Sequence, residues 1–410
     1  MKPKVSAAAI GAWLLVAIYY FYQYALRSAP SVMMPQLTTA FGVNTLGVSA
    51  IVGMFYYGYS PFSLVAGASL DRFGAKRMVP IGAALVGIGS LLFSSGNIAL
   101  ANIGRFVQGA GGAFALIGAV YLITKNFPAS VAASLIGATQ MFGMAGGSAG
   151  QFLVGPMIKR GLSWNGFWIY AGILGLIISV ALFFLLPVEK LAAEKRGGFA
   201  NLLSSLGKVF RNPQSIICGI ISGLLFIPTT ILGMTWGVRF LQEARSREYE
   251  AAVTLAAAIP LGWMIGCPLL GFISDRLGRR KPVILAGTAA LLAIVSWVLF
   301  GNPEILRGHL VGILMGIASG AAMLPYSVIK EANPPELGGT ATGVINFINF
   351  TFSALLGPVF GSRLINIPTG SDELALAHYQ AGFTPLLYGI AIAFILALFL
   401  RETGPATRKT

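Results

Sequence analysis

The sequence predicts an all-α membrane protein with twelve transmembrane helices in two pseudo-symmetric six-helix bundles. Three observations support this fold class. The 410 residues are 56% hydrophobic and only 10% charged, whereas soluble domains carry roughly 25% charged residues. Apolar runs long enough to cross a bilayer, about 20 residues each, recur along the whole chain. A basic loop sequence in the first half returns in the second half.

The apolar runs are separated by charge clusters and by turns that contain Gly, Pro or Asn. Because backbone polar groups cannot remain unpaired in lipid, each run is predicted to form a helix. The twelve runs are residues 10–38, 48–70, 78–96, 100–124, 132–158, 166–187, 212–241, 250–274, 283–301, 306–329, 338–366 and 380–401. A long connection divides them six and six, so we expect a first bundle in 1–190, a cytoplasmic linker in 191–211 and a second bundle in 212–410. Apolar residues at helical spacing from Phe199 to Phe210 favour a short helix on the inner membrane surface, with a mobile linker as the alternative.

The net charge of +15 comes mainly from Lys and Arg residues in short loops. In a soluble protein this excess would suggest nucleic-acid binding. Here we interpret it as an orientation signal and expect no nucleic-acid partner. Most of these charges fall in the loops on one side, and the positive-inside rule places that side, with both termini, in the cytoplasm. We expect a monomeric protein of the bacterial inner membrane, surrounded by the lipid bilayer.

The sequence offers no pattern for catalysis. The two cysteines, Cys218 and Cys267, lie in separate apolar runs without disulfide or metal-ligand spacing. No phosphate-binding loop occurs, and no nucleophile has a base at a recognisable spacing. We therefore expect no enzymatic activity, no metal and no cofactor.

A short loop sequence occurs twice, once in each half of the chain. Residues 67–77 read GASLDRFGAKR, and residues 271–281, 204 positions later, read GFISDRLGRRK. A repeat at this spacing indicates two copies of one structural unit. The glycines would let helices approach closely, and Asp71 lies near helix ends, where a carboxylate can bond free backbone N–H groups. The basic residues would hold the loop at the anionic inner leaflet.

This loop pattern resembles the signature of the major facilitator superfamily, and residues 105–112, RFVQGAGG, look like the fourth-span motif of that family. The resemblance covers the whole chain. It implies that the loops latch the two halves in the outward-facing state, and that Arg105 organises the fourth span and takes part in proton coupling. A loop that only fixes orientation, and an arginine packed against carbonyls, are the alternatives. The gating residues expected on this basis are Gly67, Asp71, Arg72, Gly74, Arg77, Arg105, Gly271, Asp275, Arg276 and Gly278. Residues 21–33 are also similar to the first helix of bacterial importers of amino acids and related nutrients, including phagosomal transporters.

Arg27 is the most informative charge inside a span. An ionisable group in a membrane helix costs roughly 2.5–3.5 kcal/mol on insertion scales and indicates function by default. Tyr20, Gln23, Tyr24 and Ser31 share its helix face by their spacing. A guanidinium on this polar and aromatic face could bind a carboxylate or phosphate with two hydrogen bonds. A structural arginine bonded to carbonyls is the alternative.

Uncharged polar residues at mid-span complete the predicted substrate site. Gln140 in the fifth span and Asn346 in the eleventh occupy related positions of the two halves. Asn349 lies in the eleventh span as well, and Tyr326 lies in the tenth. An amide in lipid is costly unless it is paired or wetted, and a central cavity at the repeat interface would provide both. Tyr56, Tyr57, Tyr59 and Trp263 could form its walls. His309 begins the tenth span where Arg105 lies in the fourth, and it could titrate near neutral pH, although a structural role is the alternative.

We therefore predict a secondary active transporter that moves a small anionic or zwitterionic metabolite by alternating access. An amino acid or organic acid, held by Arg27, fits this prediction. Protons or another ion could supply the coupling. No predicted span has an acidic residue near its middle, which argues against a cationic substrate. Efflux of hydrophobic drugs by proton antiport is the leading alternative, and a non-transporting receptor or sensor on the same scaffold is another.

Overall fold

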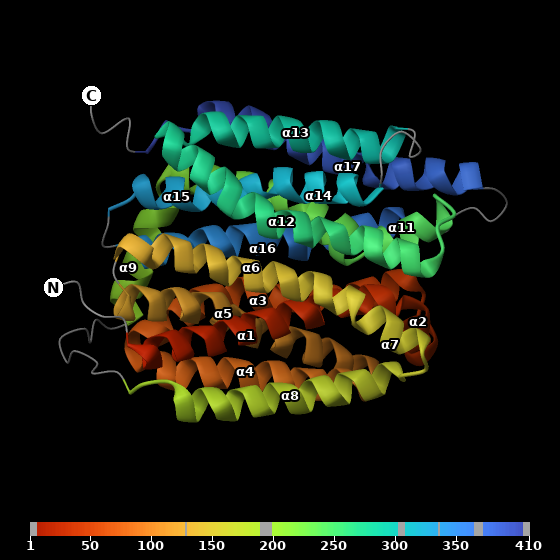
Figure 1. The fold of residues 1–410 in the computed structure, drawn as a ribbon, viewed down its shortest axis with the longest axis horizontal. Coiled ribbons are helices and arrows are strands. Elements are labelled where there is room, and N and C mark those ends of the chain that lie inside the picture. The colour runs from red at the N-terminus through yellow and green to blue at the C-terminus, as the bar shows by residue number, and fades with distance from the viewer. Residues whose placement is uncertain are drawn as a thin grey trace.

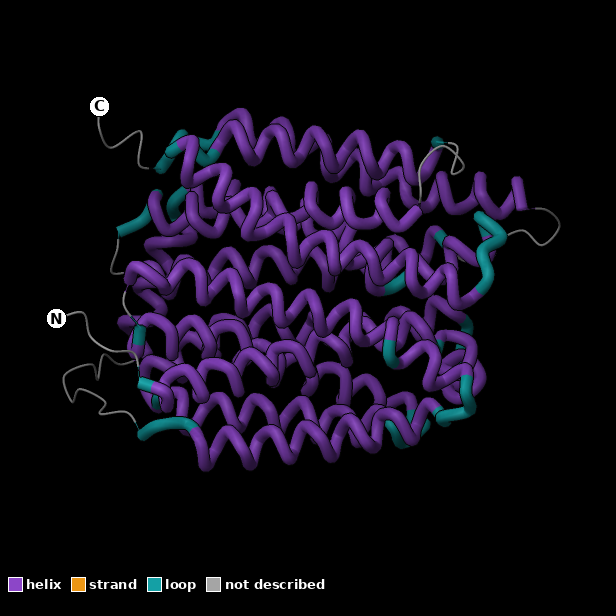
Figure 2. The backbone as a smooth tube through the Cα atoms, in the orientation of Figure 1, coloured by secondary structure: helices purple, strands orange, loops and turns teal. Residues whose placement is uncertain are grey.

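The computed structural model describes residues 6–127, 129–188, 199–301, 308–334, 337–364 and 372–404. These residues form helices joined by short loops, with no strand among them, and the long helices run side by side in one direction or its reverse (Figures 1 and 2). The helices of the first half are α1 (Ala7–Ser28), η1 (Ala29–Val32), α2 (Met34–Phe41), α3 (Thr45–Phe73), α4 (Ala75–Phe93), α5 (Ile98–Asn126), α6 (Ala129–Phe152), α7 (Val154–Lys159) and α8 (Trp164–Leu185).

The second half begins after a connecting helix, α9 (Phe199–Phe210). Its helices are α10 (Pro213–Pro228), η3 (Thr229–Gly233), α11 (Gly237–Glu243), α12 (Tyr249–Leu277), α13 (Lys281–Phe300), α14 (Gly308–Ser319), η4 (Gly320–Met323), α15 (Leu324–Glu331), α16 (Gly338–Arg363) and α17 (Asp372–Phe399). In Figure 1 the two halves form two layers, α1 to α8 on one side and α10 to α17 on the other.

The predicted fold class is confirmed. In the described residues, ten helices are long and apolar enough to cross a membrane, and α3 passes the same test together with α2, to which it is bent by 101°. The helix α6, with 24 residues, packs along α1 and α12 and supplies the remaining predicted span. The start of α1 and the end of α17 lie at the same end of the bundle as α9 (Figure 1).

The first predicted span, 10–38, is too long. The α-helix ends at Ser28, and η1 and α2 follow as separate short helices. Pro30 has no backbone N–H to donate to the carbonyl of Leu26, and this carbonyl accepts instead from Arg105 Nη1 at 3.3 Å. The chain leaves the helical conformation at Met33, whose φ is −131°. The seventh and tenth spans are broken in a similar way, by the π-helical turn η3 and the 3-10 turn η4. Such interruptions are frequent at functional sites.

The connecting helix α9 settles one alternative that the sequence left open, because the stretch from Phe199 to Phe210 is helical. The ring of Phe210 lies 6.1 Å from that of Phe347 on α16. Of the predicted linker, residues 191–198 lie outside the described residues.

The two halves meet along two pairs of helices, α3 with α16 and α6 with α12. Near one end, Lys159 pairs with Glu250 at 2.8 Å, and the Tyr249 hydroxyl donates to the Val32 carbonyl at 2.8 Å. Nearer the middle, Asn346 Nδ2 donates to Ser63 Oγ at 3.0 Å. These contacts place polar groups of both halves around the centre of the molecule.

Candidate functional site

The side chain of Arg27 lies inside the first half, near the interface between the two halves. It is 2% exposed, and none of its three side-chain nitrogens has a hydrogen-bond partner. Its guanidinium carbon lies 3.9 Å from the ring centre of Tyr24 on the same helix and 5.0 Å from that of Phe350 on α16. Four further rings lie within 5.5–6.0 Å: Tyr56, Phe55, Phe226 and Tyr59. Arg27 therefore sits in an aromatic cage that both halves build.

The aromatic rings around Arg27 offset only part of the free-energy cost of burying its guanidinium. A cation over an aromatic face gains roughly 0.5–2 kcal/mol, but a guanidinium also has five N–H donors, and leaving buried donors unpaired is costly. Gln23, one helical turn earlier, is fully buried and also has no partner for either amide atom. The two side chains form a cluster of unused hydrogen-bonding groups that an anionic ligand could satisfy.

A small cavity of about 10 Å³ lies beside this cage, enough for about one water. Its lining comes from both halves and consists of Tyr20, Tyr24, Leu116, Gln140, Phe226, Trp263, Met323, Tyr326, Asn346, Asn349 and Phe350. Gln140 and Asn346 line it as predicted, but Arg27 does not. The rings of Tyr24, Phe226 and Phe350 line the cavity and also face the guanidinium. In this closed arrangement Arg27 lies one layer of aromatic rings behind the cavity.

The polar residues of the cavity bond to one another. The Tyr20 hydroxyl donates to Gln140 Oε1 at 2.8 Å. The Tyr326 hydroxyl donates to Asn346 Oδ1 at 3.0 Å and accepts from Asn349 Nδ2 at 3.2 Å. Asn349 Oδ1 has no partner and therefore offers a free acceptor at the cavity.

Two residues predicted for this site lie elsewhere. Ser31 falls after the end of α1, in η1, and its hydroxyl donates to the Ser28 carbonyl at 2.7 Å. Ser31 therefore does not share the helix face of Tyr20 and Arg27, because the α-helix ends at Ser28. Tyr57 is 39% exposed on the outer surface of the bundle, whereas its neighbours Tyr56 and Tyr59 are buried against Arg27.

Arg105 on α5 is buried as deeply as Arg27 but is fully engaged. Its guanidinium donates to the Val52 carbonyl, to the Leu26 carbonyl at 3.3 Å and to Gln108 Oε1 at 2.6 Å. These acceptors come from α1, α3 and α5, so Arg105 ties three helices of the first half together. The geometry agrees with the structural alternative that the sequence left open.

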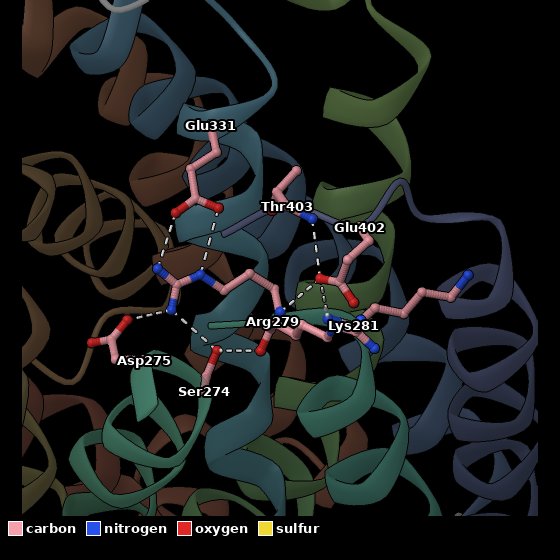
Figure 3. Close-up of polar contacts among 8 residues, drawn as sticks. Ser274, Asp275, Arg279, Lys281, Glu331, Glu402 and Thr403 are labelled. Atoms are coloured by element: carbon pink, nitrogen blue, oxygen red, sulfur yellow. Dashed lines mark hydrogen bonds and ion pairs between the residues drawn. The ribbon is translucent and has the colours of Figure 1, made fainter. Parts of the chain in front are cut away.

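The second copy of the loop forms an ionic cluster (Figure 3), at the end of the second half where α17 ends. Arg280 bonds to Asp275 and to Ser274, and its guanidinium lies 3.0 Å from Glu331 on α15. Arg276 is exposed, so the arginine that pairs with Asp275 lies five residues further on. All of these partners belong to the second half.

The N-terminus of α13 is capped from the end of the chain. Glu402 Oε1 accepts from the backbone N–H groups of Arg280 at 2.7 Å and Lys281 at 3.2 Å (Figure 3). A carboxylate at a helix N-terminus is stabilised by the unpaired N–H groups and the helix dipole. The cap predicted for the loop aspartate is therefore made by Glu402 in the second copy.

The glycines of the two loops differ from the prediction. A Cβ atom at Gly67 or Gly271 would meet nothing within 4 Å, so these residues are not sites of close helix contact. Gly74 and Gly278 instead have φ angles of 77° and 63°, which other residues rarely adopt. Arg77 is exposed, and the side chains of Asp71 and Arg72 lie outside the described residues.

Phe226 and Phe350 are the site residues that the sequence analysis missed. Both are apolar residues in apolar helices, so no local pattern separates them from the core. The position of Phe350 next to Asn349 was the only available signal. Their role becomes visible only when the second half packs against α3 and α6 of the first half.

Comparison with known proteins agrees with this architecture. The family model of the Major Facilitator Superfamily matches residues 16–358. The membrane sensor protein UhpC of Salmonella typhimurium is 23% identical, over 96% of this chain and 92% of that protein. The probable galactarate/D-glucarate transporter GudP of Bacillus subtilis is 24% identical, over 97% of this chain and 92% of that protein.

Among solved structures, the nucleoside transporter NupG is similar over 95% of this chain and 99% of its own, with a TM-score of 0.73. At 15% identity this likeness shows the fold alone. The chain belongs to the Major Facilitator Superfamily and is a multi-pass membrane protein, a secondary transporter and not an enzyme.

Proposed function

We propose that this protein takes up a small metabolite that carries a carboxylate or a similar anionic group, and that Arg27 binds this group. The observation that carries the proposal is the unpaired guanidinium of Arg27, buried at the interface of the two halves. Arginine presents a planar set of donors that matches a carboxylate or phosphate with two hydrogen bonds. The described acidic residues lie in loops or near helix ends, so none of them pairs with the Arg27 guanidinium.

The other buried polar groups without a partner restrict the chemical class of the ligand further. Asn349 Oδ1 is an unused acceptor at the cavity, and it would pair with a hydroxyl or an amine of the ligand. Gln23 offers both a donor and an acceptor. An organic acid with hydroxyl groups, or a zwitterionic amino acid, would satisfy this combination. The relative GudP is named as a transporter of two such hydroxylated acids.

The closed cavity fits one stage of alternating access. A site of about 10 Å³ cannot hold a metabolite, so the halves would have to separate before binding. Contacts such as Lys159 with Glu250 join the halves at the predicted outer side. We place both termini in the cytoplasm and the protein in the bacterial inner membrane, because the basic loops favour that orientation. Co-transport of protons or another ion is part of the proposal.

A binding screen followed by a flux assay tests this function. Purified protein would be heated with carboxylates including D-glucarate, and with amino acids, phosphates, sugars and hydrophobic drugs. A ligand that binds only the folded state raises the melting temperature. The hit would then be assayed for counterflow in proteoliposomes. A hit among anions or zwitterions with saturable counterflow supports the proposal, and hits confined to hydrophobic drugs would overturn it in favour of efflux.

A sensor is the second candidate, because the relative UhpC is named as a membrane sensor protein. The same assay separates the two. A transporter gives counterflow of the ligand that it binds, whereas a sensor binds that ligand without any flux.

A further inference from the structure

A second and much larger pocket lies in the second half, away from Arg27. Its volume is about 440 Å³, within the range of about 300–1,000 Å³ that is typical of small-molecule sites. Its walls come from η3, α11, α12, α13 and α14, and they are mostly apolar, with Leu232, Phe240, Ile259, Trp297 and Met315 among them. None of these residues lines the central cavity.

The repeat explains why a hollow exists here. The 204-residue offset between the two loops relates Arg105 of the first half to His309 of the second. In the first half, the guanidinium of Arg105 fills this position and lies 5.8 Å and 5.9 Å from the rings of Phe93 and Trp168. In the second half, His309 is exposed, and its ring nitrogen bonds to Thr254 Oγ1 at 3.2 Å. The histidine lines the pocket but does not fill it.

The described ionisable residues that line this pocket are all basic. Arg245, Arg247 and His309 line it, and no described acidic side chain does. The Arg245 guanidinium bonds to the carbonyls of Val298 and Leu299 at the end of α13, at 3.0 and 3.2 Å. Arg247 is exposed. A pocket with an apolar floor and basic residues at its outer end suits a ligand with an apolar chain and one anionic group.

The position of the pocket also suits such a ligand. The basic residues lie at the helix ends and loops next to Glu250, which we place at the outer face of the membrane, and the apolar walls continue along the helices into the span. Trp297, near the end of α13, is the type of residue that is enriched at the membrane interface.

We propose that this pocket binds the acyl chain of an anionic amphiphile, with the chain against Trp297 and Met315 and the anionic group near Arg247 and His309. A free fatty-acid carboxylate and an anionic phospholipid share this chemistry. The proposal is independent of the central site.

Quenching of tryptophan fluorescence tests the proposal directly, because a brominated chain quenches a tryptophan that it touches. The protein would be placed in nanodiscs of uncharged lipid and titrated with dibromostearate, with its uncharged methyl ester, or with brominated phosphatidylglycerol. The chain has six tryptophans. The part of the fluorescence quenching that is due to Trp297 is therefore identified as the part that disappears in the Trp297→Phe variant. We expect this part of the quenching to saturate with one or both of the anionic probes, and at least tenfold weaker binding of the ester.

Two variants and a matched control complete the test. Ala251→Phe adds a ring at an exposed position in the pocket wall and is expected to abolish the quenching of Trp297 by the probe. Arg247→Gln should weaken the binding of the anionic probe about tenfold, which is the size of one lost charged hydrogen bond. Arg363→Gln removes an exposed arginine from the same side of the molecule, outside the pocket, and should change nothing. Saturation by dibromostearate identifies a fatty acid, and saturation by brominated phosphatidylglycerol identifies a phospholipid. Quenching that is unchanged in Ala251→Phe, or that saturates with neither probe, would overturn the proposal.

Discussion

Arg27 and Arg105 face the same ring, that of Phe55, with their guanidinium carbons 5.7 Å and 5.2 Å from its centre. Both side chains are buried, but their hydrogen bonding is opposite. Arg105 donates to carbonyls of two other helices, one of them the carbonyl of Leu26 next to Arg27, whereas Arg27 has no partner. Arg105 therefore stabilises the fold, whereas the donors of Arg27 are free to bind a ligand.

Replacing Arg105 should mainly affect stability. In Arg105→Lys the charge remains, but an ammonium cannot reach the carbonyls of Val52 and Leu26 and the Gln108 amide in the same geometry. We expect a loss of about 1–3 kcal/mol in the free energy of unfolding. Thermal unfolding of the purified variant measures this loss, and ligand affinity of the folded fraction should be nearly unchanged. A variant with wild-type stability would remove Arg105 from the structural role.

The two loop glycines of the first half should respond differently to alanine. Gly74 has φ 77° and ψ 163°, a region that costs about 1–3 kcal/mol for other residues. Gly67 has open space where a Cβ would lie. We expect Gly74→Ala to lower the melting temperature and Gly67→Ala to leave it unchanged or slightly raised, since alanine favours helix. Equal effects of the two variants would show that backbone geometry at Gly74 is not the constraint.

Removing the cap on α13 should loosen its first turn. Glu402→Ala deletes the acceptor for the N–H groups of Arg280 and Lys281, a change that costs about 0.5–2 kcal/mol at typical helix caps. Hydrogen exchange of these two amides should accelerate. Glu402→Gln keeps an acceptor without the charge, so its effect should be smaller. Unchanged exchange in Glu402→Ala would show that the cap contributes nothing.

Much of the fold was predictable because lipid imposes it. The composition and the length of the apolar runs predicted the helices, and the repeated loop predicted two related halves. Local chemistry also singled out Arg27, since a lone cation in a membrane span is rare. The break of the first span after Ser28 could not have been inferred from Pro30 alone, because other prolines, such as Pro61 and Pro260, lie inside continuous helices.

The rest of the site depends on contacts between distant segments. Phe226 and Phe350 cage Arg27 from helices that are about 200 and 320 positions away in the sequence, and nothing in their own neighbourhoods marks them. The partner of Asp275 is Arg280 and not the adjacent Arg276, because the turn at Gly278 redirects the chain. The pocket of about 440 Å³ in the second half was not predicted from the sequence either, since a hollow is a property of packing and not of any residue type.

The central claim is that Arg27 binds the anionic group of the substrate. It is tested most directly by uptake into proteoliposomes of the anion selected in the binding screen, with wild-type, Arg27→Lys and Arg105→Lys proteins at matched amounts. An ammonium cannot reproduce the two parallel hydrogen bonds of a guanidinium. The loss of about 1–3 kcal/mol corresponds to roughly ten- to a hundredfold in affinity. We predict that Arg27→Lys loses most uptake while its stability stays closer to wild type than that of Arg105→Lys. Near-normal uptake by Arg27→Lys would contradict the claim.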